Sequence, residues 1–237
     1  DDMNIVLLLE EDFVDSDRVV ISGRRLEHIT EVHGAVKGDS LRVGKLNGKL
    51  GEGEILSIDD KRIEMKIKLH EDPPPPSDIQ LVMAMPRPKV FRRMLQDMTT
   101  MGIKKINVIK TWKVEKSFWE SPVLDEEKLR ESMILGLEQA KDTIMPEIRV
   151  FKRFKPFVED ELPAIIRGTE CLLGHPGGEY LCEKSEGGKV TLAIGPEGGF
   201  TPYEVEMFKS QGFKVFSLGE RILRVETVLP YILGKLS

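Results

Sequence analysis

The sequence predicts an α/β protein in which a small β-rich part precedes a larger part built on a parallel sheet. A run of four prolines at 73–76 cannot continue a helix or a central strand, and we expect it to be stiff and extended. Upstream of this run, side chains alternate with the two-residue period of a half-buried strand. Downstream, apolar strands alternate with helical segments, which favours a parallel sheet. We therefore assign residues 1–72 to a small β-barrel or sandwich, 73–77 to a linker and 78–237 to an α/β domain.

The strands of the first domain are predicted from alternation and from turn residues. Between Ile63 and Leu69, apolar side chains alternate with charged ones, as on a strand with one buried face. Asn47 and Gly48 suit the positive φ angles of a tight hairpin turn, and a short strand around Val43 precedes them. These elements predict the small β-barrel or sandwich of residues 1–72.

The second domain contains alternating strands and helices, and one helix has a strong start signal. Thr201 can cap that helix, Pro202 suits its first position and Glu204 completes a capping box. The predicted strands are 78–84, 105–109, 171–173, 190–194 and 214–218, and the predicted helices are 89–101, 125–142, 201–211 and 226–236.

Three glycine-rich loops, at 174–178, 195–200 and 219–224, follow predicted strands. The carboxyl ends of parallel strands meet at one edge of a sheet, where ligands bind, and glycines there allow close approach of the backbone. The loops lack the endings of a Walker loop or a dinucleotide fingerprint. Glu197 and Pro196 also disfavour a phosphate cradle, because they add a negative charge and remove an N–H donor. We therefore expect a ligand with a purine ring and a positive charge.

Composition excludes several other classes of protein. The formal net charge of −5 argues against nonspecific coating of nucleic acid, so local clusters must carry any RNA binding. Apolar stretches such as Ile5–Leu9 are too short to cross a membrane, and the first residues lack the features of a signal peptide, so we expect a cytoplasmic protein. Cys171 and Cys182 predict reduced buried thiols, and four scattered histidines predict no metal site.

Two carboxy-terminal blocks carry a family resemblance. The run Gly-Pro-Glu-Gly-Gly-Phe at 195–200 and the run Leu-Gly-Glu-Arg-Ile-Leu-Arg-Val-Glu-Thr at 218–227 closely resemble, in order and spacing, the RsmE family of 16S ribosomal RNA uridine-N3 methyltransferases. Further matching positions are Met85–Pro86, Gln96, 101–103, Glu138–Gln139 and 146–148, so the resemblance covers most of the second domain. The first domain is more loosely similar, through His28–Ile29 and 37–39, to the PUA-like β-barrel of that family.

This resemblance implies a SPOUT fold, in which the last part of the chain threads through a loop and forms a deep trefoil knot that holds S-adenosylmethionine. General topology rules would instead predict an unknotted sheet. The resemblance also implies that the PUA-like barrel helps to grip RNA, that 16S ribosomal RNA in the small ribosomal subunit is the partner, and that the chain forms a homodimer. The apolar stripe between Val228 and Leu236 could be core or part of a dimer interface.

The site residues follow from the loops and the implied reaction. Methylation at uracil N3 requires removal of a proton and in-line positioning of the methyl group. Arg224 could bind a phosphate or the uracil oxygen that becomes negative, and Glu197 or Glu226 could accept the proton or offset the sulfonium charge. Glu226 also suits a helix start. The cofactor residues that we assign are Leu173, Gly174, Gly195, Pro196, Glu197, Gly198, Gly199, Leu218, Gly219, Ile222 and Leu223. The RNA-binding residues that we assign are Arg87, Lys89, Arg92, Arg93 and Arg221, for which a plain solvated surface is the alternative.

Several positions depart from the family pattern, among them the expected Arg near Val32 that is replaced around His33–Gly34, and they leave other functions open. Asp97 stands where the family usually has Lys, Thr100 where it has Glu, and Asp142 where it has Arg. The alternatives are a methyltransferase for another RNA base or for transfer RNA, a noncatalytic RNA-binding assembly factor, and an unrelated nucleotide-binding enzyme.

Overall fold

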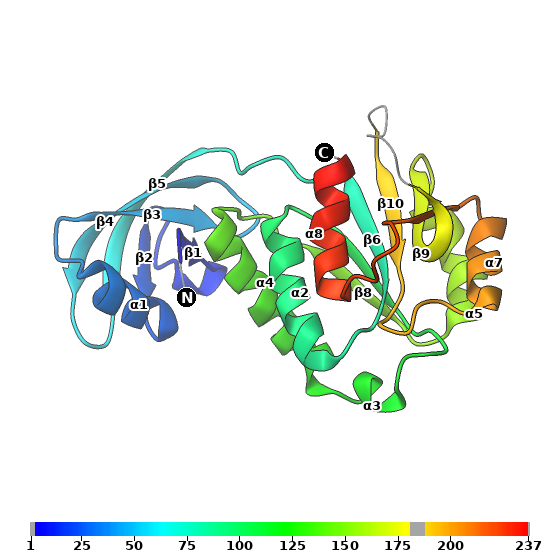
Figure 1. Cartoon of the computed structure of the whole chain (residues 1–237). Helices are drawn as coiled ribbons and strands as arrows, with labels where there is room; N and C mark the ends of the chain where they lie inside the picture. Colours follow the sequence, from blue (N-terminus) through cyan, green and yellow to red (C-terminus); the bar gives the residue numbers. More distant parts are fainter. Residues whose placement is uncertain (1–2, 181–187, 237) are drawn as a thin grey trace. The chain divides into compact units, whose positions relative to one another are not determined.

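The computed structural model describes residues 3–180 and 188–236, which form two compact units (Figure 1). The half-barrel unit comprises Asp1–Pro75, Gln96–Gly102 and Arg130–Met145. The α/β unit comprises Pro76–Leu95, Ile103–Leu129 and Pro146–Ser237.

The half-barrel unit is built on a curled five-stranded sheet with the order β1-β3-β4-β5-β2 (Figure 1). Neighbouring strands in this sheet are antiparallel, except that β1 and β3 are parallel. The strands are β1 (Val6–Leu8), β2 (Arg18–Ile21), β3 (Ser40–Lys45), β4 (Leu50–Ile58) and β5 (Ile63–Glu71), and the unit also contains the 3-10 helix η1 (Glu10–Asp12) and the helix α1 (Arg24–His33). The predicted hairpin turn is confirmed between β3 and β4, where Asn47 has a φ of 57°.

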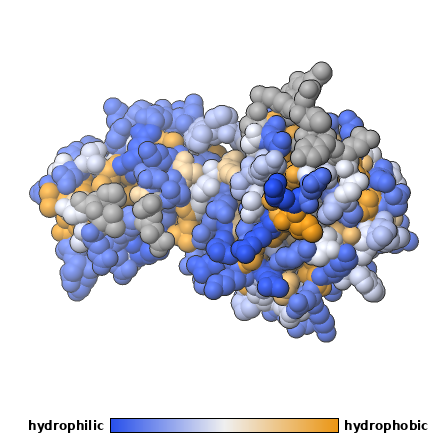
Figure 2. Space-filling model, in the orientation of Figure 1, coloured by the Kyte–Doolittle hydropathy of each residue, from blue (hydrophilic) through white to orange (hydrophobic). Residues whose placement is uncertain are grey.

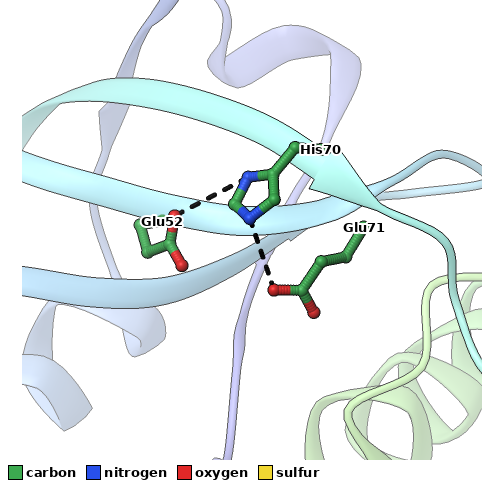
Figure 3. A group of neighbouring side chains, drawn as sticks. All are labelled: Glu52, His70 and Glu71. Atoms are coloured by element: carbon green, nitrogen blue, oxygen red, sulfur yellow. Dashed lines mark ion pairs between the residues drawn. The ribbon is translucent and has the colours of Figure 1, made fainter.

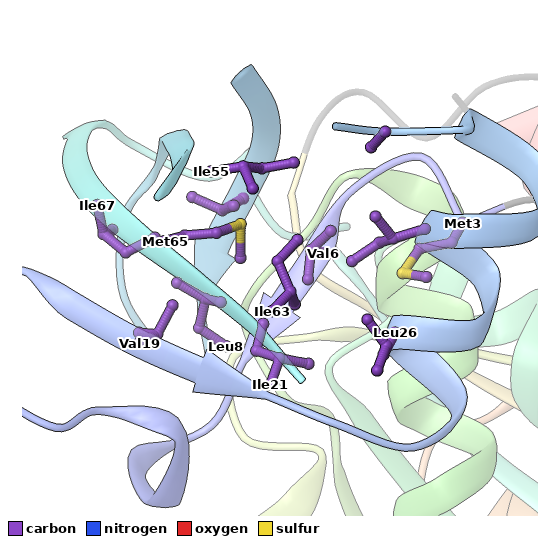
Figure 4. Close-up of a cluster of buried hydrophobic side chains, with 13 residues drawn as sticks. Met3, Val6, Leu8, Val19, Ile21, Leu26, Ile55, Ile63, Met65 and Ile67 are labelled. Atoms are coloured by element: carbon purple, nitrogen blue, oxygen red, sulfur yellow. The ribbon is translucent and has the colours of Figure 1, made fainter. Parts of the chain in front are cut away.

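The apolar face of this sheet encloses the core of the unit (Figure 4). Val19, Ile21, Ile63 and Met65 are all fully buried there, as the two-residue alternation predicts. Leu26 on α1 packs against the same cluster. At Gly51, an added Cβ would lie 1.9 Å from the backbone oxygen of Lys68, so only glycine fits where β4 passes β5.

Residues 130–145 also belong to the half-barrel unit, and Glu138 holds them there. The backbone oxygen of Glu138 accepts hydrogen bonds from the N–H groups of Asn4 at 3.0 Å and Ile5 at 3.2 Å. Its carboxylate, which is 1% exposed, pairs with Arg24 at 2.9 Å. Glu138, one of the positions of the family resemblance, therefore has a structural role in this unit.

The α/β unit contains a six-stranded parallel sheet with the order β11-β9-β10-β6-β7-β8. Its strands are β6 (Ile79–Ala84), β7 (Lys105–Ile109), β8 (Glu147–Phe151), β9 (Glu170–Tyr180), β10 (Val190–Ile194) and β11 (Lys214–Ser217). The predicted parallel sheet is confirmed, and β8 is a strand that the sequence patterns did not predict. All five residues of β10 are buried, as expected for a strand with both faces covered.

The strand order contains a crossover near the carboxyl end of the chain. The chain leaves β10, passes through a helix and returns as β11 on the far side of β9. The threading of the knot itself stays a prediction.

Two predicted helices follow β6 in the sequence, α2 (Pro88–Thr100) and α4 (Glu126–Ala140), and their bounds lie close to the predicted ones. Both α7 (Pro202–Ser210) and α8 (Val225–Leu236) also confirm predicted helices. The short elements α3 (Lys116–Trp119), η2 (Pro122–Leu124), α5 (Phe154–Pro156), η3 (Phe157–Glu161) and α6 (Leu162–Ile165) were not predicted.

The surface is mostly hydrophilic, with small hydrophobic patches on the face shown in Figure 2. None of the helices in the described part of the chain combines the length and the hydropathy that a membrane span requires. The cytoplasmic location stays a prediction.

Candidate functional site

The loop after β10 is tightly folded by its glycines. The N–H of Gly199 donates to the backbone oxygen of Pro196 at 2.8 Å, and Gly199 has a φ of +69°, a conformation that favours glycine. A Cβ on Gly195 would lie 3.1 Å from the backbone nitrogen of Phe200. The loop therefore offers peptide groups to a ligand without intervening side chains.

The predicted start of α7 after this loop is confirmed. The hydroxyl of Thr201 accepts a hydrogen bond from the Glu204 N–H at 3.3 Å, and the Glu204 carboxylate accepts one from the Thr201 N–H at 2.8 Å. The other Glu204 oxygen accepts from the N–H of Trp112 at 2.7 Å. Glu204 is 2% exposed, so one buried carboxylate fixes both the helix start and the loop after β7.

The loop at 174–178 is a bulge inside β9, which corrects the prediction that this strand ends at Leu173. Leu173 pairs with Val215 of β11, whereas the next β11 residue pairs with Glu179, so the residues between them are looped out. Gly174 pairs with Ile194 at the end of β10. The bulge and the loop after β10 are therefore neighbours at the carboxyl edge of the sheet.

The third loop follows β11 and leads into α8. Gly219 has a φ of +108°, and the backbone oxygen of Arg224 accepts hydrogen bonds from the first turn of α8. Ile222 is 89% exposed and Leu223 is half-buried, so this loop leaves apolar side chains available. Leu218 and Gly219 are also half-buried.

The structure thus brings the three predicted loops to one edge of the sheet, at the bulge in β9. The glycines leave the peptide groups of the loops accessible to a ligand, and the loop after β11 supplies apolar side chains. Together, these features suit a purine nucleoside. Leu173 is fully buried in the core, so only its backbone can contact a ligand. Pro196 is buried, whereas Glu197 and Gly198 are exposed.

Two contacts tie the loop after β10 to neighbouring segments. A carboxylate oxygen of Glu197 accepts a hydrogen bond from the backbone N–H of Arg87 at 3.2 Å, just before α2. The ammonium of Lys113 donates to the backbone oxygen of Gly198 at 2.6 Å. The sequence analysis did not single out Lys113, because nothing in its local pattern marks a residue that reaches this loop.

The first turns of α2 expose cations on one side and bury apolar side chains on the other. Phe91 and Met94 are buried. The exposed cations at this place are Arg87, Lys89, Arg92 and Arg93. Among the residues that the structure describes, no carboxylate pairs with these four side chains, so their charges remain available to phosphates.

The remaining predicted side chains lie at the start of α8. Arg221 and Arg224 are exposed, and Glu226 is half-buried in the first turn, where a negative charge favours the helix. The stripe on α8 is largely core: Leu229, Ile232, Leu233 and Leu236 are buried within the chain.

The positions that depart from the family pattern make local contacts in the half-barrel unit. The Thr100 hydroxyl donates to the backbone oxygen of Asp97 at 2.8 Å. A carboxylate oxygen of Asp142 accepts from the Ile144 N–H at 3.0 Å. These three residues lie outside the glycine loops.

One cluster on the half-barrel unit has metal-ligand residue types (Figure 3). Ligand atoms of Glu52, His70 and Glu71 lie within 4.8 Å of one another. Arg42 pairs with both carboxylates, at 2.8 Å from Glu71 and 3.6 Å from Glu52. Its hydrogen bond holds the pKa of Glu71 below the usual value. A guanidinium thus already supplies the positive charge, and the cluster is an exposed ion-pair network.

The predicted buried thiol is confirmed for Cys171, which is 8% exposed. Burial raises the pKa of the Cys171 thiol, which disfavours a reactive thiolate. Cys182 lies outside the described residues.

Comparisons with known proteins agree with this geometry. Residues 73–237 match the family described as RNA methyltransferase domain. A Treponema pallidum protein named ribosomal RNA small subunit methyltransferase E is 31% identical, over 95% of this chain and 87% of that protein. A Borreliella burgdorferi protein named ribosomal RNA small subunit methyltransferase E 1 is 25% identical, over 95% of this chain and 93% of that protein.

A solved structure has the same fold over nearly the whole chain. It is a ribosomal RNA small subunit methyltransferase E from Neisseria gonorrhoeae bound to S-adenosyl methionine, with a TM-score of 0.74 and 18% identity, covering 97% of this chain and 95% of that one. Because the domain match covers the glycine loops and the relatives cover nearly the whole chain, the chain belongs to the RsmE family of ribosomal RNA small subunit methyltransferases.

Proposed function

We propose that this chain transfers a methyl group from S-adenosylmethionine to N3 of a uridine in 16S ribosomal RNA of the small ribosomal subunit. The contact of Glu197 with the Arg87 N–H carries the proposal, because it joins the glycine loop to the cationic start of α2. A methyl donor and an RNA phosphate can therefore bind side by side. Family membership and the names of the relatives support methyl transfer to RNA of the small ribosomal subunit.

The residues at the bulge in β9 and in the two neighbouring loops fit the proposed cofactor. Peptide groups of 195–199 and of Gly174 can hydrogen-bond the ribose and the adenine edge, while Leu218, Ile222 and Leu223 can cover the ring. When bound, S-adenosylmethionine supplies an electrophilic methyl group on a positively charged sulfur. Exposed Glu197 can offset that charge from within the loop.

The protein side chains must position the uracil and accept its N3 proton. Arg224 is exposed beside the start of α8 and can bind a uracil oxygen or a neighbouring phosphate. Glu197 and Glu226 are the candidate bases. We expect Arg224→Gln to lower the rate of methyl transfer more than the affinity for the cofactor, and equal losses in both would exclude this role.

A homodimer also belongs to the proposal, on the strength of the family resemblance. Because the apolar stripe of α8 is buried within the chain, a dimer must use other residues, such as the outer face of α8 with Tyr231, which is 43% exposed. One chain has a mass of 26.9 kDa, and sedimentation equilibrium should give twice that mass. A monomer at micromolar concentration would contradict the dimer.

The direct test uses small ribosomal subunits that lack native uridine-N3 methylation. Labelled S-adenosylmethionine is incubated with these subunits and the protein, and the labelled nucleotide is mapped. We expect label at uridine N3. Label at another base would support a different RNA target, and cofactor binding without any transfer to intact subunits would favour the noncatalytic assembly role.

A further inference from the structure

A cavity lies in the α/β unit beside the loop after β10, and Thr201, which directly follows that loop, belongs to its lining. Its volume is about 660 Å³, within the range of small-molecule sites of about 300–1,000 Å³. It lies between the loop after β7, the segment after β8 and the start of α7. Its lining includes Lys110, Thr111, Trp112, Lys152, Phe154 and Tyr203. None of the residues assigned to the cofactor lines it.

The aromatic side chains of this cavity are unusually open. Trp112 is 85% exposed and Tyr203 is 57% exposed, although both are large apolar groups that burial would stabilise. Exposed aromatic rings are the platforms on which proteins stack the bases of single-stranded nucleic acid. The hydrogen bond of the Trp112 N–H to buried Glu204 fixes the backbone of this platform before any ligand arrives.

The charge of the cavity suits a phosphate. Among the described residues, Lys110 and Lys152 have no carboxylate partner, whereas Lys155, which also lines the cavity, lies 3.7 Å from Glu159. The acidic lining residue Glu204 is buried, and both of its oxygens accept backbone hydrogen bonds. Cations therefore dominate the accessible charge.

The wall of the cavity also contains an unsatisfied polar group. Thr111 lines the cavity and is 3% exposed, and its hydroxyl oxygen has no hydrogen-bond partner among the described residues. Buried hydroxyl groups are normally hydrogen-bonded, because leaving one unpaired costs free energy. The oxygen is itself enclosed, so this unpaired hydroxyl belongs to the cavity wall and is not a ligand contact.

We propose that this cavity binds one unstacked nucleotide of the RNA substrate, next to the target uridine. Its base stacks on Trp112 and Tyr203, and its phosphate pairs with Lys110 or Lys152. The neighbouring residue Lys113 bonds to Gly198 of the glycine loop, so RNA that reaches the cavity passes close to the proposed methyl donor. This inference rests on the proposed function for its ligand class, and it concerns RNA binding rather than methyl transfer.

Tryptophan fluorescence provides the test. The chain has two tryptophans, and Trp119 is 8% exposed, so Trp119→Phe leaves Trp112 as the single reporter. We expect saturable quenching of Trp112 emission by an eight-nucleotide single-stranded oligouridylate. RNA binding that is seen by anisotropy of a labelled oligomer without quenching would overturn the proposal. Quenching by S-adenosylhomocysteine alone would also overturn it, because the cavity would then be a cofactor site.

Variants separate stacking from charge. Trp112→Ala should weaken oligomer binding by about tenfold, as expected for the loss of one base stack, and should leave cofactor affinity unchanged. Lys110→Gln with Lys152→Gln should weaken binding and reduce its salt dependence, whereas Lys116→Gln, an exposed lysine outside the cavity, should not. Equal effects of the cavity and control lysines would contradict a site here. These experiments measure RNA binding and do not require methyl transfer. The absence of methyl transfer would therefore contradict the proposed function without deciding whether the cavity binds RNA.

Discussion

Replacing Glu204 by Ala tests whether one buried carboxylate organises the start of α7 and the loop after β7. The side chain is 2% exposed and accepts hydrogen bonds from the N–H groups of Thr201 at 2.8 Å and Trp112 at 2.7 Å. A hydrogen bond to a charged group contributes about 1.5–3 kcal/mol, so the loss of both should cost about 3 kcal/mol at the lower limit. The loss of the capping box is included in this figure, because the Thr201 bond is half of that box.

The assay is urea unfolding followed by circular dichroism. Glu206→Ala is the matched control, because Glu206 lies on the same helix, is exposed and pairs only at the surface with Lys209, at 2.8 Å. Such a pair contributes about 0–1 kcal/mol. Glu204→Gln keeps one hydrogen-bond acceptor, so its loss of free energy of unfolding should lie between those of Glu204→Ala and Glu206→Ala. If Glu204→Ala and Glu206→Ala changed the free energy of unfolding equally, the carboxylate would not have this role.

Three further predictions concern packing, protonation and RNA. Gly51→Ala should destabilise the protein by about 2 kcal/mol or more in thermal unfolding, because its Cβ would overlap a backbone oxygen of the adjacent strand, and an unchanged Tm would contradict this contact. Arg42→Gln should raise the pKa of Glu71 towards its ordinary value in an NMR titration. A carboxyl group with a lowered pKa stabilises the fold at pH values above its unfolded-state pKa, and this stabilisation is lost as the pH falls through the folded-state pKa. The free energy of unfolding of the variant should therefore change less with pH in the acid range. Arg92→Gln with Arg93→Gln should weaken RNA binding and lower the slope of its salt dependence by about 2, as measured by anisotropy, and an unchanged slope would mean that neither arginine contacts a phosphate.

Local sequence patterns were sufficient to predict several elements of the fold. The capping box at Thr201 and the turn at Asn47 depend on residues within four positions of each other, and both form as predicted. The alternation from Ile63 also correctly identified the buried face of β5. By contrast, β8 is a short edge strand of partly exposed residues, so its pattern was too weak to predict.

The glycine runs indicated where backbone could approach a ligand, but not how the loops would be formed. The run after Leu173 was predicted to end a strand, whereas β9 continues beyond it because β11 pairs with residues on both sides of the bulge. This pairing is invisible in the sequence of β9. It depends on a partner strand about forty residues later in the chain.

The sequence by itself determined the elements with local signals and, through its carboxy-terminal motifs, the family. Tertiary structure decided which distant residues meet: Glu204 with Trp112, 92 positions away, and Glu138 with Arg24, 114 positions away. A cap or a turn is stabilised by neighbours in the chain, so its residues reveal it. A contact between distant residues forms only when strand order and helix packing bring them together, and for this reason the cavity at Trp112 emerged only from the fold.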